Sequence, residues 1–404
     1  MSPPPAGPRP HLDIASAAPW HPRALVALTQ VAEGFPADPT RLHRAGRDAS
    51  DLLERARGAV AEELGGRPDA VTFTSGATEA IHLAIRGTAA ADATRPRRIV
   101  SCAVEHSAVL SAADAVAATG SHEHIRVGVD ADGRIRLDEL EEVLGDGAVL
   151  VNVQHANHEV GTVQPLADVV RLCREADALL HVDAAQTAGR LPVSLERLDV
   201  DYLSVSAAKF GGGRGVGALL TSPRARVQGI LTGDERERRR RAGLQNLPGI
   251  AAMAEVLATL RPRNPAGEAG GEVSRADAVR RHLRRRLADS VPDLEVHGPD
   301  DDTLSHLVAC SALYVEGQAL VTALDAAGWA VHSGSSCATT SGEPSHVLVA
   351  MGALTHGHVR VSFDHRFGTD HADAFVEDLA RVVSEQRARL GIEPGGLGWP
   401  AGSR

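Results

Sequence analysis

The most informative residue for chemistry is Lys209, because it is the only lysine among the 42 lysines and arginines of the chain. A general bias toward arginine explains this wherever only charge matters, and it makes the one retained amine informative. Arginine keeps its proton, whereas lysine can lose it and form a Schiff base. Lys209 follows an apolar run (YLSVS, residues 202–206) and precedes a glycine-rich loop. It is therefore a candidate for amine chemistry with a lowered pKa, the alternative being a solvated loop lysine.

A second candidate is Cys337, one of four widely spaced cysteines that lack the spacing of a metal site, so no metal is expected. It lies in a polar stretch, SGSSCATTSGEP (residues 333–344), where a thiol is expected to be exposed and reactive. Cys173 and Cys310 are expected to be buried. Cys337 is thus a candidate nucleophile, the alternative being a chance surface cysteine.

Two polar turns follow apolar strands. TSGATE (residues 74–79) places small residues and the Thr78 hydroxyl at a helix start, where free backbone N–H groups can bind a phosphate. The turn could equally be an ordinary capped helix, and it is neither a dinucleotide-binding G-x-G-x-x-G nor a P-loop. In HVDAAQ (residues 181–186), Asp183 ends a strand at the edge where parallel sheets bind ligands. Such a carboxylate can pair with a pyridinium nitrogen or cap a helix.

These residues must be positioned by an alternation of apolar strands and amphipathic helices, which predicts a doubly wound α/β domain with a buried sheet. The expected strands cover residues 71–74, 98–101, 149–153, 179–182, 202–206 and 216–220, and the helices 77–87, 106–118 and 166–176. After residue 249 the pattern changes. Helices over 250–260, 274–288 and 371–390, with strands over 305–313 and 359–363, predict a smaller α+β domain.

The predicted organisation therefore has four parts. Residues 1–10 are expected to be a flexible proline-rich arm, 11–249 the large domain, 250–392 the small domain, and 393–404 a flexible tail, with a hinge at residues 261–270. The net charge of −10 gives no global basic field, so direct nucleic-acid binding is not expected. No apolar run is long enough to cross a membrane, and the first residues do not resemble a signal peptide, so a cytoplasmic location without membrane association is predicted.

Taken together, the motifs resemble those of the NifS/IscS-type cysteine desulfurases of the class V aminotransferase superfamily. The resemblance spans residues 12–390. It rests on landmarks in family-like order: TSGATE, Glu105-His106, HEVG (residues 158–161), HVDAAQ, the strand before Lys209, NLPGI (246–250), the SGSSC…EPSHVL loop, and VRVSF around Arg360. It implies a fold type I enzyme that depends on pyridoxal 5'-phosphate (PLP), with a large doubly wound α/β domain and a smaller α+β domain.

The resemblance also implies a role for each matching residue. Lys209 would form the Schiff base with the cofactor and move protons, Cys337 would be the nucleophile, and Arg360 would grip the substrate carboxylate. His106 would stack on the cofactor ring and act as acid or base, the alternative being a surface histidine at a helix start. The other implied cofactor contacts are Ala77, Thr78 and Ser206 on the phosphate, Asp183 on the ring nitrogen, Gln186 on the phenolic oxygen, and His158.

Several positions depart from the family pattern. Ala208 stands where the family has a histidine, and Leu244 replaces a threonine that contacts the neighbouring subunit's cofactor phosphate. His158 stands where the family has an asparagine, although a one-residue shift would give that role to Asn157. The spacing to Asp183 favours His158. These changes predict a working enzyme with a remodelled cofactor site.

The implied activity is removal of sulfur from L-cysteine, giving L-alanine and a persulfide on Cys337 for transfer to an acceptor protein. A homodimer is implied as well. One alternative is another class V PLP enzyme, such as a lyase, transaminase or epimerase on a different amino acid. A non-catalytic binding subunit and a partner-dependent sulfur donor are further alternatives. The run RERRRR (residues 236–241) is interpreted as a solvated helix face, the alternative being a docking site for an acidic partner or nucleic acid.

Overall fold

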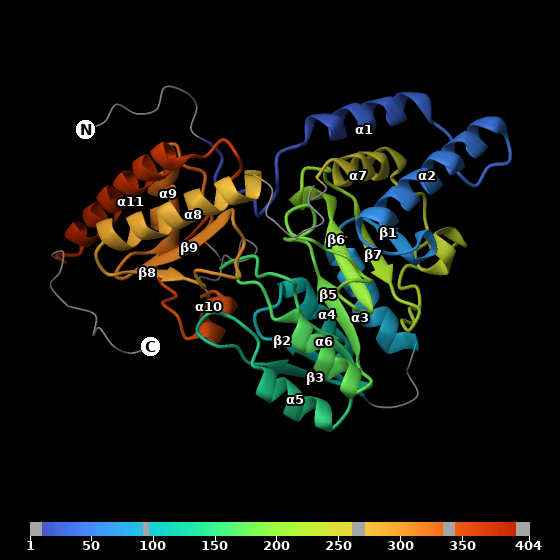
Figure 1. Cartoon of the computed structure of the whole chain (residues 1–404), viewed down its shortest axis with the longest axis horizontal. Helices are drawn as coiled ribbons and strands as arrows, with labels where there is room; N and C mark the ends of the chain where they lie inside the picture. The colour runs from blue at the N-terminus through green and yellow to red at the C-terminus, as the bar shows by residue number, and fades with distance from the viewer. Residues whose placement is uncertain (1–9, 92–96, 261–270, 334–343, 393–404) are drawn as a thin grey trace.

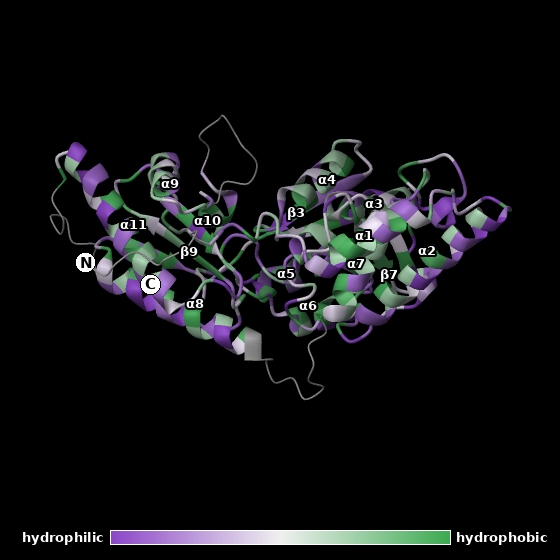
Figure 2. Cartoon of the chain, turned by 90° about the horizontal axis from the view of Figure 1, so that it is seen from above, coloured by the Kyte–Doolittle hydropathy of each residue, from purple (hydrophilic) through white to green (hydrophobic). Residues whose placement is uncertain are grey.

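The chain folds into two units, each built on its own sheet. The computed structural model describes residues 10–91, 97–260, 271–333 and 344–392. In Figure 1, the small sheet lies at the left of the picture with α8, α9 and α11, and the large sheet lies to the right of it with its own helices. Hydrophobic and hydrophilic residues alternate along α2, α8 and α11 (Figure 2), as expected for helices that press one face on a core. None of the described helices is long and apolar enough to span a membrane.

The large sheet has seven strands in the order β1-β7-β6-β5-β4-β2-β3. They are β1 Val71–Thr74, β2 Arg97–Cys102, β3 His122–Val127, β4 Ala148–Asn152, β5 Leu179–Asp183, β6 Tyr202–Ser206 and β7 Gly217–Thr221. The five strands from β3 to β6 run parallel, whereas β7 pairs antiparallel with both β6 and β1. The inner parallel strands β4, β5 and β6 are almost entirely buried because helices cover both faces, whereas β3 at the edge of the sheet is partly exposed.

Helices cover both faces of this sheet. Apolar side chains of α3 (Ala77–Ala91) and α4 (Ser107–Ala117) form one core with the sheet. On the other face, α5 (Leu137–Gly145) and α6 (Leu166–Glu175) share a core with α2 (Arg44–Glu63) and α7 (Leu247–Thr259). The helix α1 (Pro22–Gly34) packs on α7. The carboxyl ends of the parallel strands are left open to the small unit.

The small sheet has three antiparallel strands in the order β10-β9-β8. They are β8 Leu294–His297, β9 Leu307–Ala312 and β10 His358–Ser362. The helices α8 (Gly271–Ser290), α9 (Gly317–Ala326) and α11 (Thr369–Arg389) pack on it and enclose a second core around Trp329 and Phe375. The short α10 (His346–Met351) instead contributes Val347, Leu348 and Met351 to the core of the large unit.

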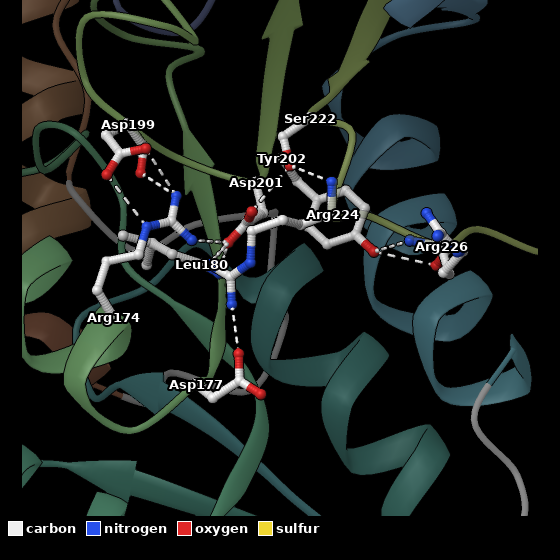
Figure 3. Close-up of polar contacts among 9 residues, drawn as sticks. All are labelled: Arg174, Asp177, Leu180, Asp199, Asp201, Tyr202, Ser222, Arg224 and Arg226. Carbon is white, nitrogen blue, oxygen red and sulfur yellow. Dashed lines mark hydrogen bonds and ion pairs between the residues drawn. The ribbon is translucent and has the colours of Figure 1, made fainter.

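The amino end of β6 is fixed by Asp201, a fully buried carboxylate. Its oxygens accept hydrogen bonds from Arg174 Nη1 (2.9 Å), the Leu180 backbone N–H (3.0 Å) and Ser222 Oγ (2.8 Å) (Figure 3). A buried charge is tolerated only when it is paired and hydrogen-bonded. Asp201 therefore ties β5, β6 and the end of β7 together at the edge opposite the open carboxyl ends.

The expected strands and helices are present, each within a few residues of its predicted ends. The structure adds elements that the sequence pattern did not reveal: α1, α2, β3, α5, β8, α9 and α10. Cys102, Cys173 and Cys310 are buried, and burial raises the pKa of the Cys173 and Cys310 thiols to about 12, so they are inert. The expected hinge at residues 261–270 lies outside the described residues. The domain boundaries at residues 249 and 392 stay predictions.

The arginine-rich run differs from its interpretation as a solvated helix face. It forms a short 3-10 turn, Arg236–Arg239, in which Glu237 and Arg238 adopt left-handed backbone angles. Arg236 pairs with Asp38 at 2.7 Å and Arg241 with Glu79 at 3.0 Å. These two guanidinium groups already have carboxylate partners within the chain, whereas Arg238 and Arg239 are exposed. The alternative of a docking site stays a prediction.

Candidate active site

Lys209 lies at the open end of the large sheet, in the short 3-10 turn Ala207–Lys209 that follows β6. Its Nζ donates hydrogen bonds to the backbone carbonyls of Ala15 and Ser16, both at 2.8 Å. Gln186 Nε2 donates to the same Ala15 carbonyl at 3.0 Å. The amine is thus oriented by an N-terminal segment that is distant in the sequence.

Asp183 is the last residue of the neighbouring strand β5 and is only 8% exposed. Its Oδ1 accepts a hydrogen bond from the Ala185 N–H at 2.9 Å. Burial raises the pKa of Asp183 to about 6, against the opposing effects of this hydrogen bond and of the Lys209 charge. The side chain is therefore a buried acid at the carboxyl edge of the sheet, as its place in the sequence predicted.

Two histidines lie together beside this acid. His106 caps α4, since its Nδ1 accepts a hydrogen bond from the Ala108 N–H at 3.1 Å. Its ring meets the ring of His158 edge to face, with centroids 5.1 Å apart. Burial, together with the charge of Lys209, lowers the pKa of His106 to about 4. Burial, together with the charge of Arg360, lowers the pKa of His158 well below its usual range, so both rings are neutral.

Asn157 is committed to the backbone rather than to a ligand. Its Nδ2 donates to the Val104 carbonyl at 3.1 Å, and its Oδ1 accepts from the N–H groups of Glu159 and Val160, both at 2.8 Å. Both ring nitrogens of the neighbouring His158 are instead buried with no hydrogen-bond partner among the described residues. This contrast supports His158 over Asn157 as the side chain available to a ligand.

Arg360 reaches the site from β10 of the small sheet and is 4% exposed. Its Nη1 donates to the His158 carbonyl at 2.9 Å, and its Nη2 donates to Asp13 Oδ1 and Ser16 Oγ, both at 2.7 Å. Its Nε has no partner among the described residues. A guanidinium held in this way can grip a carboxylate.

The turn at residues 74–79 has the features of an anion site at the start of α3. Glu79 accepts a hydrogen bond from the Ser75 N–H at 2.8 Å and pairs with Arg241 Nε at 3.0 Å, which stabilises the turn. The turn packs closely on β7, since a Cβ on Gly217 would lie 2.6 Å from the backbone of Gly76. Thr78 remains exposed, and Ala77 and Gly76 are half-buried. An anion can therefore approach the first turn of α3.

The residues present fit a phosphorylated pyridine cofactor. Buried polar atoms are normally hydrogen-bonded, so the unpartnered nitrogens of His158 and Arg360, and Oε2 of buried Glu105, point to a polar ligand between them. The site also brings together an amine, a buried acid, neutral imidazoles and a helix start. These are the groups that such a ligand requires.

Most of the predicted site residues meet at this edge: Ala77, Thr78, His106, His158, Asp183, Gln186, Ser206, Lys209 and Arg360. Cys337 lies outside the described residues. The contacts of the Ala15 and Ser16 carbonyls and of Asp13 were not predicted from the sequence. Backbone acceptors leave no signature in residue type, and one aspartate beside a short apolar segment matches no motif.

A model of the aminotransferase class V family matches residues 11–375. The chain belongs to this family. A cysteine desulfurase IscS of Dictyoglomus turgidum is 32% identical over 93% of this chain and 95% of its own length. A putative cysteine desulfurase IscS 1 of Bacillus subtilis is 34% identical over 94% and 99%, respectively. A solved structure of a NifS-like protein superposes with a TM-score of 0.84 at 30% identity, covering 93% of this chain and all of the other.

Membership in the class V family confirms the predicted resemblance and fold class. The mixed seven-stranded sheet and the small antiparallel sheet match the solved NifS-like structure. The family depends on PLP. The roles of individual residues stay predictions.

Proposed function

We propose that this class V enzyme is a PLP-dependent cysteine desulfurase. It takes sulfur from L-cysteine, releases L-alanine, and holds the sulfur as a persulfide on Cys337 for an acceptor protein. The observation that carries the proposal is the meeting of three side chains at the carboxyl edge of the large sheet. Asp183 and Lys209 come from the large sheet and the turn after it, and Arg360 comes from β10 of the small sheet. The relatives named cysteine desulfurases, aligned over nearly the whole chain, support this choice of reaction.

In this proposal, protein side chains would hold the cofactor at its ring nitrogen, its phenolic oxygen and its phosphate. Asp183 would pair with the ring nitrogen, Gln186 would contact the phenolic oxygen, and the first turn of α3 with Thr78 and Ser206 would bind the phosphate. Ala208 offers no side-chain donor. His106 would lie against the ring, with His158 beside it. When bound, PLP supplies an aldehyde that condenses with amines and a ring that accepts electrons from the substrate Cα.

The chain's own residues would bind the substrate and move its protons. Arg360 binds the carboxylate of L-cysteine through hydrogen bonds to a charged group. Lys209 Nζ, poised by two carbonyls, takes the Cα proton and later returns a proton. His106 is neutral because burial lowers its pKa to about 4, so its ring can accept the proton of the substrate thiol.

The described segments that precede and follow residue 337 in the sequence both contact the site. His332 and Arg360 exchange backbone hydrogen bonds of 3.2 and 2.7 Å. On the other side, His346 Nε2 lies 2.8 Å from the Glu105 carbonyl, next to His106. Cys337 is five residues from His332, a span of at most about 18 Å. This reach supports Cys337 as the thiol that takes the substrate sulfur.

The test is to measure L-alanine and protein persulfide formed from L-cysteine. The wild-type enzyme should form both. Cys337→Ala should lose the persulfide while still binding the cofactor, and Lys209→Ala should lose turnover. Cys173→Ala, which removes a buried thiol of high pKa, should behave as wild type. Full turnover by Lys209→Ala, or a persulfide that survives in Cys337→Ala, would contradict the proposal.

A homodimer that donates sulfur to an acceptor protein in the cytoplasm completes the proposal. Large apolar side chains are exposed at the start of α1, with Trp20, Leu25 and Val26 at 36%, 48% and 56%. Leu244, at 62%, is a further exposed apolar residue. Such patches mark protein contact surfaces. Light scattering on the purified chain should give twice the monomer mass.

A different class V reaction is the second candidate, and His158 favours it. An imidazole in place of the family's asparagine changes the polarity around the ring and leaves two buried nitrogens to satisfy. Titration of the loaded enzyme with a panel of amino acids, followed by the cofactor absorbance, distinguishes the two. A response to L-cysteine without alanine formation, together with product from another amino acid, would select this candidate.

A further inference from the structure

A buried polar pair joins the two units of the chain beside Arg360. Glu159 lies in the loop between β4 and α6, and His358 is the first residue of β10; both side chains are buried. Glu159 Oε1 lies 3.6 Å from His358 Nε2, and neither atom has a hydrogen-bond partner among the described residues. Buried polar atoms are normally hydrogen-bonded, so two such atoms that face each other need a reason.

The pair lies next to the contact that holds Arg360. Successive residues of a strand point to opposite faces, so His358 and Arg360, two positions apart on β10, share one face of the small sheet. The opposite face of this strand packs in the core of the small unit. Arg360 Nη1 donates to the carbonyl of His158, the residue before Glu159, at 2.9 Å. Two consecutive residues of the loop therefore meet two side chains of β10.

The other ring nitrogen of His358 is held by a polar row across the small sheet. His358 Nδ1 lies 3.2 Å from Ser311 Oγ on β9, and Ser311 Oγ lies 2.7 Å from His297 Nε2 on β8. At the outer end, His297 Nδ1 lies 3.7 Å from Oε1 of the exposed Glu295. A hydroxyl can both donate and accept, so Ser311 can serve either neutral form of the ring if His297 takes the complementary form. The row fixes the ring and leaves Nε2 toward Glu159.

The ring of His358 is neutral. Burial lowers its pKa well below the usual value, and the charges of His297, Arg360 and His332 act in the same direction, while the backbone of Cys310 opposes them. A neutral imidazole carries one hydrogen, on either Nδ1 or Nε2. If that hydrogen is on Nδ1, the atom that faces the loop is a lone pair and requires a donor.

Glu159 is able to be that donor. Burial raises its pKa to about 7, against Ser345 at the start of α10 and Arg360 on β10. Within its own loop, the neighbouring His158 ring is neutral, and Asn157 Oδ1 accepts a hydrogen bond from the Glu159 backbone N–H at 2.8 Å. Below neutral pH the Glu159 carboxyl group therefore carries a hydrogen that it can donate.

We propose that Glu159 and His358 share one proton across the boundary between the two units, and that this contact is a positioning device for Arg360. With the proton on Glu159, its hydroxyl donates to His358 Nε2 and the ring hydrogen is on Nδ1. When the proton of Glu159 moves to Nε2, the hydrogen on Nδ1 leaves along the row through Ser311, so one proton passes to solvent in all. The 3.6 Å separation is about 0.4 Å beyond a hydrogen bond, and rotation of the carboxyl group closes it.

Loss of this proton changes what Arg360 can bind. Arg360 Nη2 already pairs with Asp13 Oδ1 at 2.7 Å. An ionised Glu159 places a second carboxylate near the same guanidinium, and charges interact strongly in a buried site. The substrate carboxylate then meets negative surroundings, so the protonated form of Glu159 favours its binding. This consequence rests on the proposed role of Arg360 toward L-cysteine, whereas the shared proton does not.

The first test follows the ring hydrogen of His358. Nitrogen-15 NMR of the histidine-labelled full-length enzyme distinguishes the two neutral forms of the ring from each other and from the charged form. The His358 signals are identified by their loss in His358→Gln. We expect a neutral ring whose hydrogen lies on Nδ1 below the Glu159 pKa of about 7 and on Nε2 above it.

The matched variant for this test is Glu159→Gln. Its amide donates to His358 Nε2 at every pH, so the ring hydrogen should stay on Nδ1. A wild-type ring that keeps one form across neutral pH, a charged ring, or a ring that still changes form in Glu159→Gln would overturn the proposal. If His358→Gln does not fold, the His358 signal is the one whose pH response disappears in Glu159→Gln.

The second test measures the consequence for Arg360. The KM for L-cysteine of the wild type, divided by that of Glu159→Gln, should rise about 10-fold from pH 6 to pH 8, with little change in the ratio of kcat values. The ratio cancels the titration of the substrate itself. Glu123→Gln, in an exposed pair with Arg98 on the far edge of the large sheet, is the control and should give a constant ratio.

The two tests separate this inference from the proposed function. A KM ratio that stays constant, although the ring hydrogen moves, would overturn the positioning role of the pair. Activity on a different amino acid would contradict the proposed function and not the shared proton, because the NMR experiment needs no turnover.

Discussion

Arg360 illustrates how one side chain can be prepared for its ligand. Asp13, Ser16 and the His158 carbonyl together hold its two terminal nitrogens. The guanidinium plane is therefore fixed before any substrate carboxylate arrives. We expect Arg360→Lys to lower kcat/KM for L-cysteine about 10- to 100-fold, because lysine keeps the charge and loses the planar fork.

The measurement is steady-state alanine formation, with PLP binding followed separately by absorbance. Arg366→Lys is the matched control, since Arg366 is exposed and pairs with Asp364. A variant that loses PLP binding while keeping the same kcat/KM per loaded site would show that Arg360 serves the fold rather than the substrate.

Glu159 makes the stability of the folded protein depend on pH. Burial raises the pKa of Glu159 from 4.5 to about 7, against the opposing effects of Ser345 and Arg360. His358 Nε2 lies 3.6 Å from its Oε1. The folded state thus holds this proton more tightly than the unfolded state. The wild-type protein loses the corresponding stability as the pH rises from about 4.5 through 7, by about 3 kcal/mol in total.

Glu159→Gln removes this loss, because glutamine stays neutral. The free energy of unfolding of the variant relative to wild type should rise with pH across that interval and level off above it. Urea unfolding at several pH values measures the difference. A relative stability that is constant, or that falls with pH, would show that the Glu159 pKa is not raised in the folded state.

At the residue scale, the sequence was informative where a residue type is chemically singular. Lys209 stood out because arginine replaces lysine everywhere else, and Asp183 stood out because it ends an apolar strand. The acceptors of Lys209 are backbone carbonyls, and Glu159 and His358 are distant in the sequence. Neither contact can be recognised before the packing of the two units is known.

Among the elements, the turn at Arg236–Arg239 is joined to α2 by a buried ion pair and to β1 by a hydrogen bond. Glu237 accepts hydrogen bonds from Arg57 at 2.8 and 2.9 Å and from the Phe73 N–H at 2.9 Å. Burial alone would raise the pKa of Glu237, but Arg57 outweighs it and the pKa is lowered. This contribution to stability is present above the ordinary glutamate pKa and is lost in acid.

Glu237→Ala should destabilise the protein by about 3–5 kcal/mol, because it removes the buried partner of Arg57 and leaves this buried charge with the exposed carboxylate of Glu54. Glu235→Ala, two residues away and in an exposed pair with Arg239, should change stability little. Denaturant unfolding at neutral pH compares the two variants. Equal effects of both substitutions would show that the buried pair contributes no more than a surface pair.

At the element scale, the strands and helices that carry continuous apolar runs or a clear helical period were predicted well. Short or half-exposed elements were not. β3 (HEHIRV) lies at the edge of the sheet and is buried only at its two ends, and α5 is a short helix in which only Leu140 and Leu144 are buried. The arginine run was interpreted as a helix face. In the structure Glu237 points inward to pair with Arg57, and Glu237 and Arg238 adopt left-handed backbone angles that interrupt a helix.

At the scale of the whole molecule, the N-terminal segment connects the two units at the site. The Leu12 N–H donates to the Ala330 carbonyl at 3.0 Å, and the Leu12 carbonyl accepts from the Ser362 N–H at 2.8 Å, in the small unit. A few residues later, the Ala15 and Ser16 carbonyls hold Lys209 of the large unit. The segment therefore sets the distance between Arg360 and Lys209.

Leu12 anchors this segment, since its side chain is fully buried in the core of the small sheet. Leu12→Ala should destabilise the small unit by about 2–5 kcal/mol through the cavity it leaves. Because the same segment orients Lys209 and, through Asp13, Arg360, PLP affinity and kcat/KM should fall as well. Leu42→Ala, at a position that is 89% exposed, is the control and should change neither. Calorimetry and PLP titration by absorbance measure the two effects. A destabilised Leu12→Ala enzyme with wild-type PLP affinity and kcat/KM would show that the segment holds the fold without positioning the site.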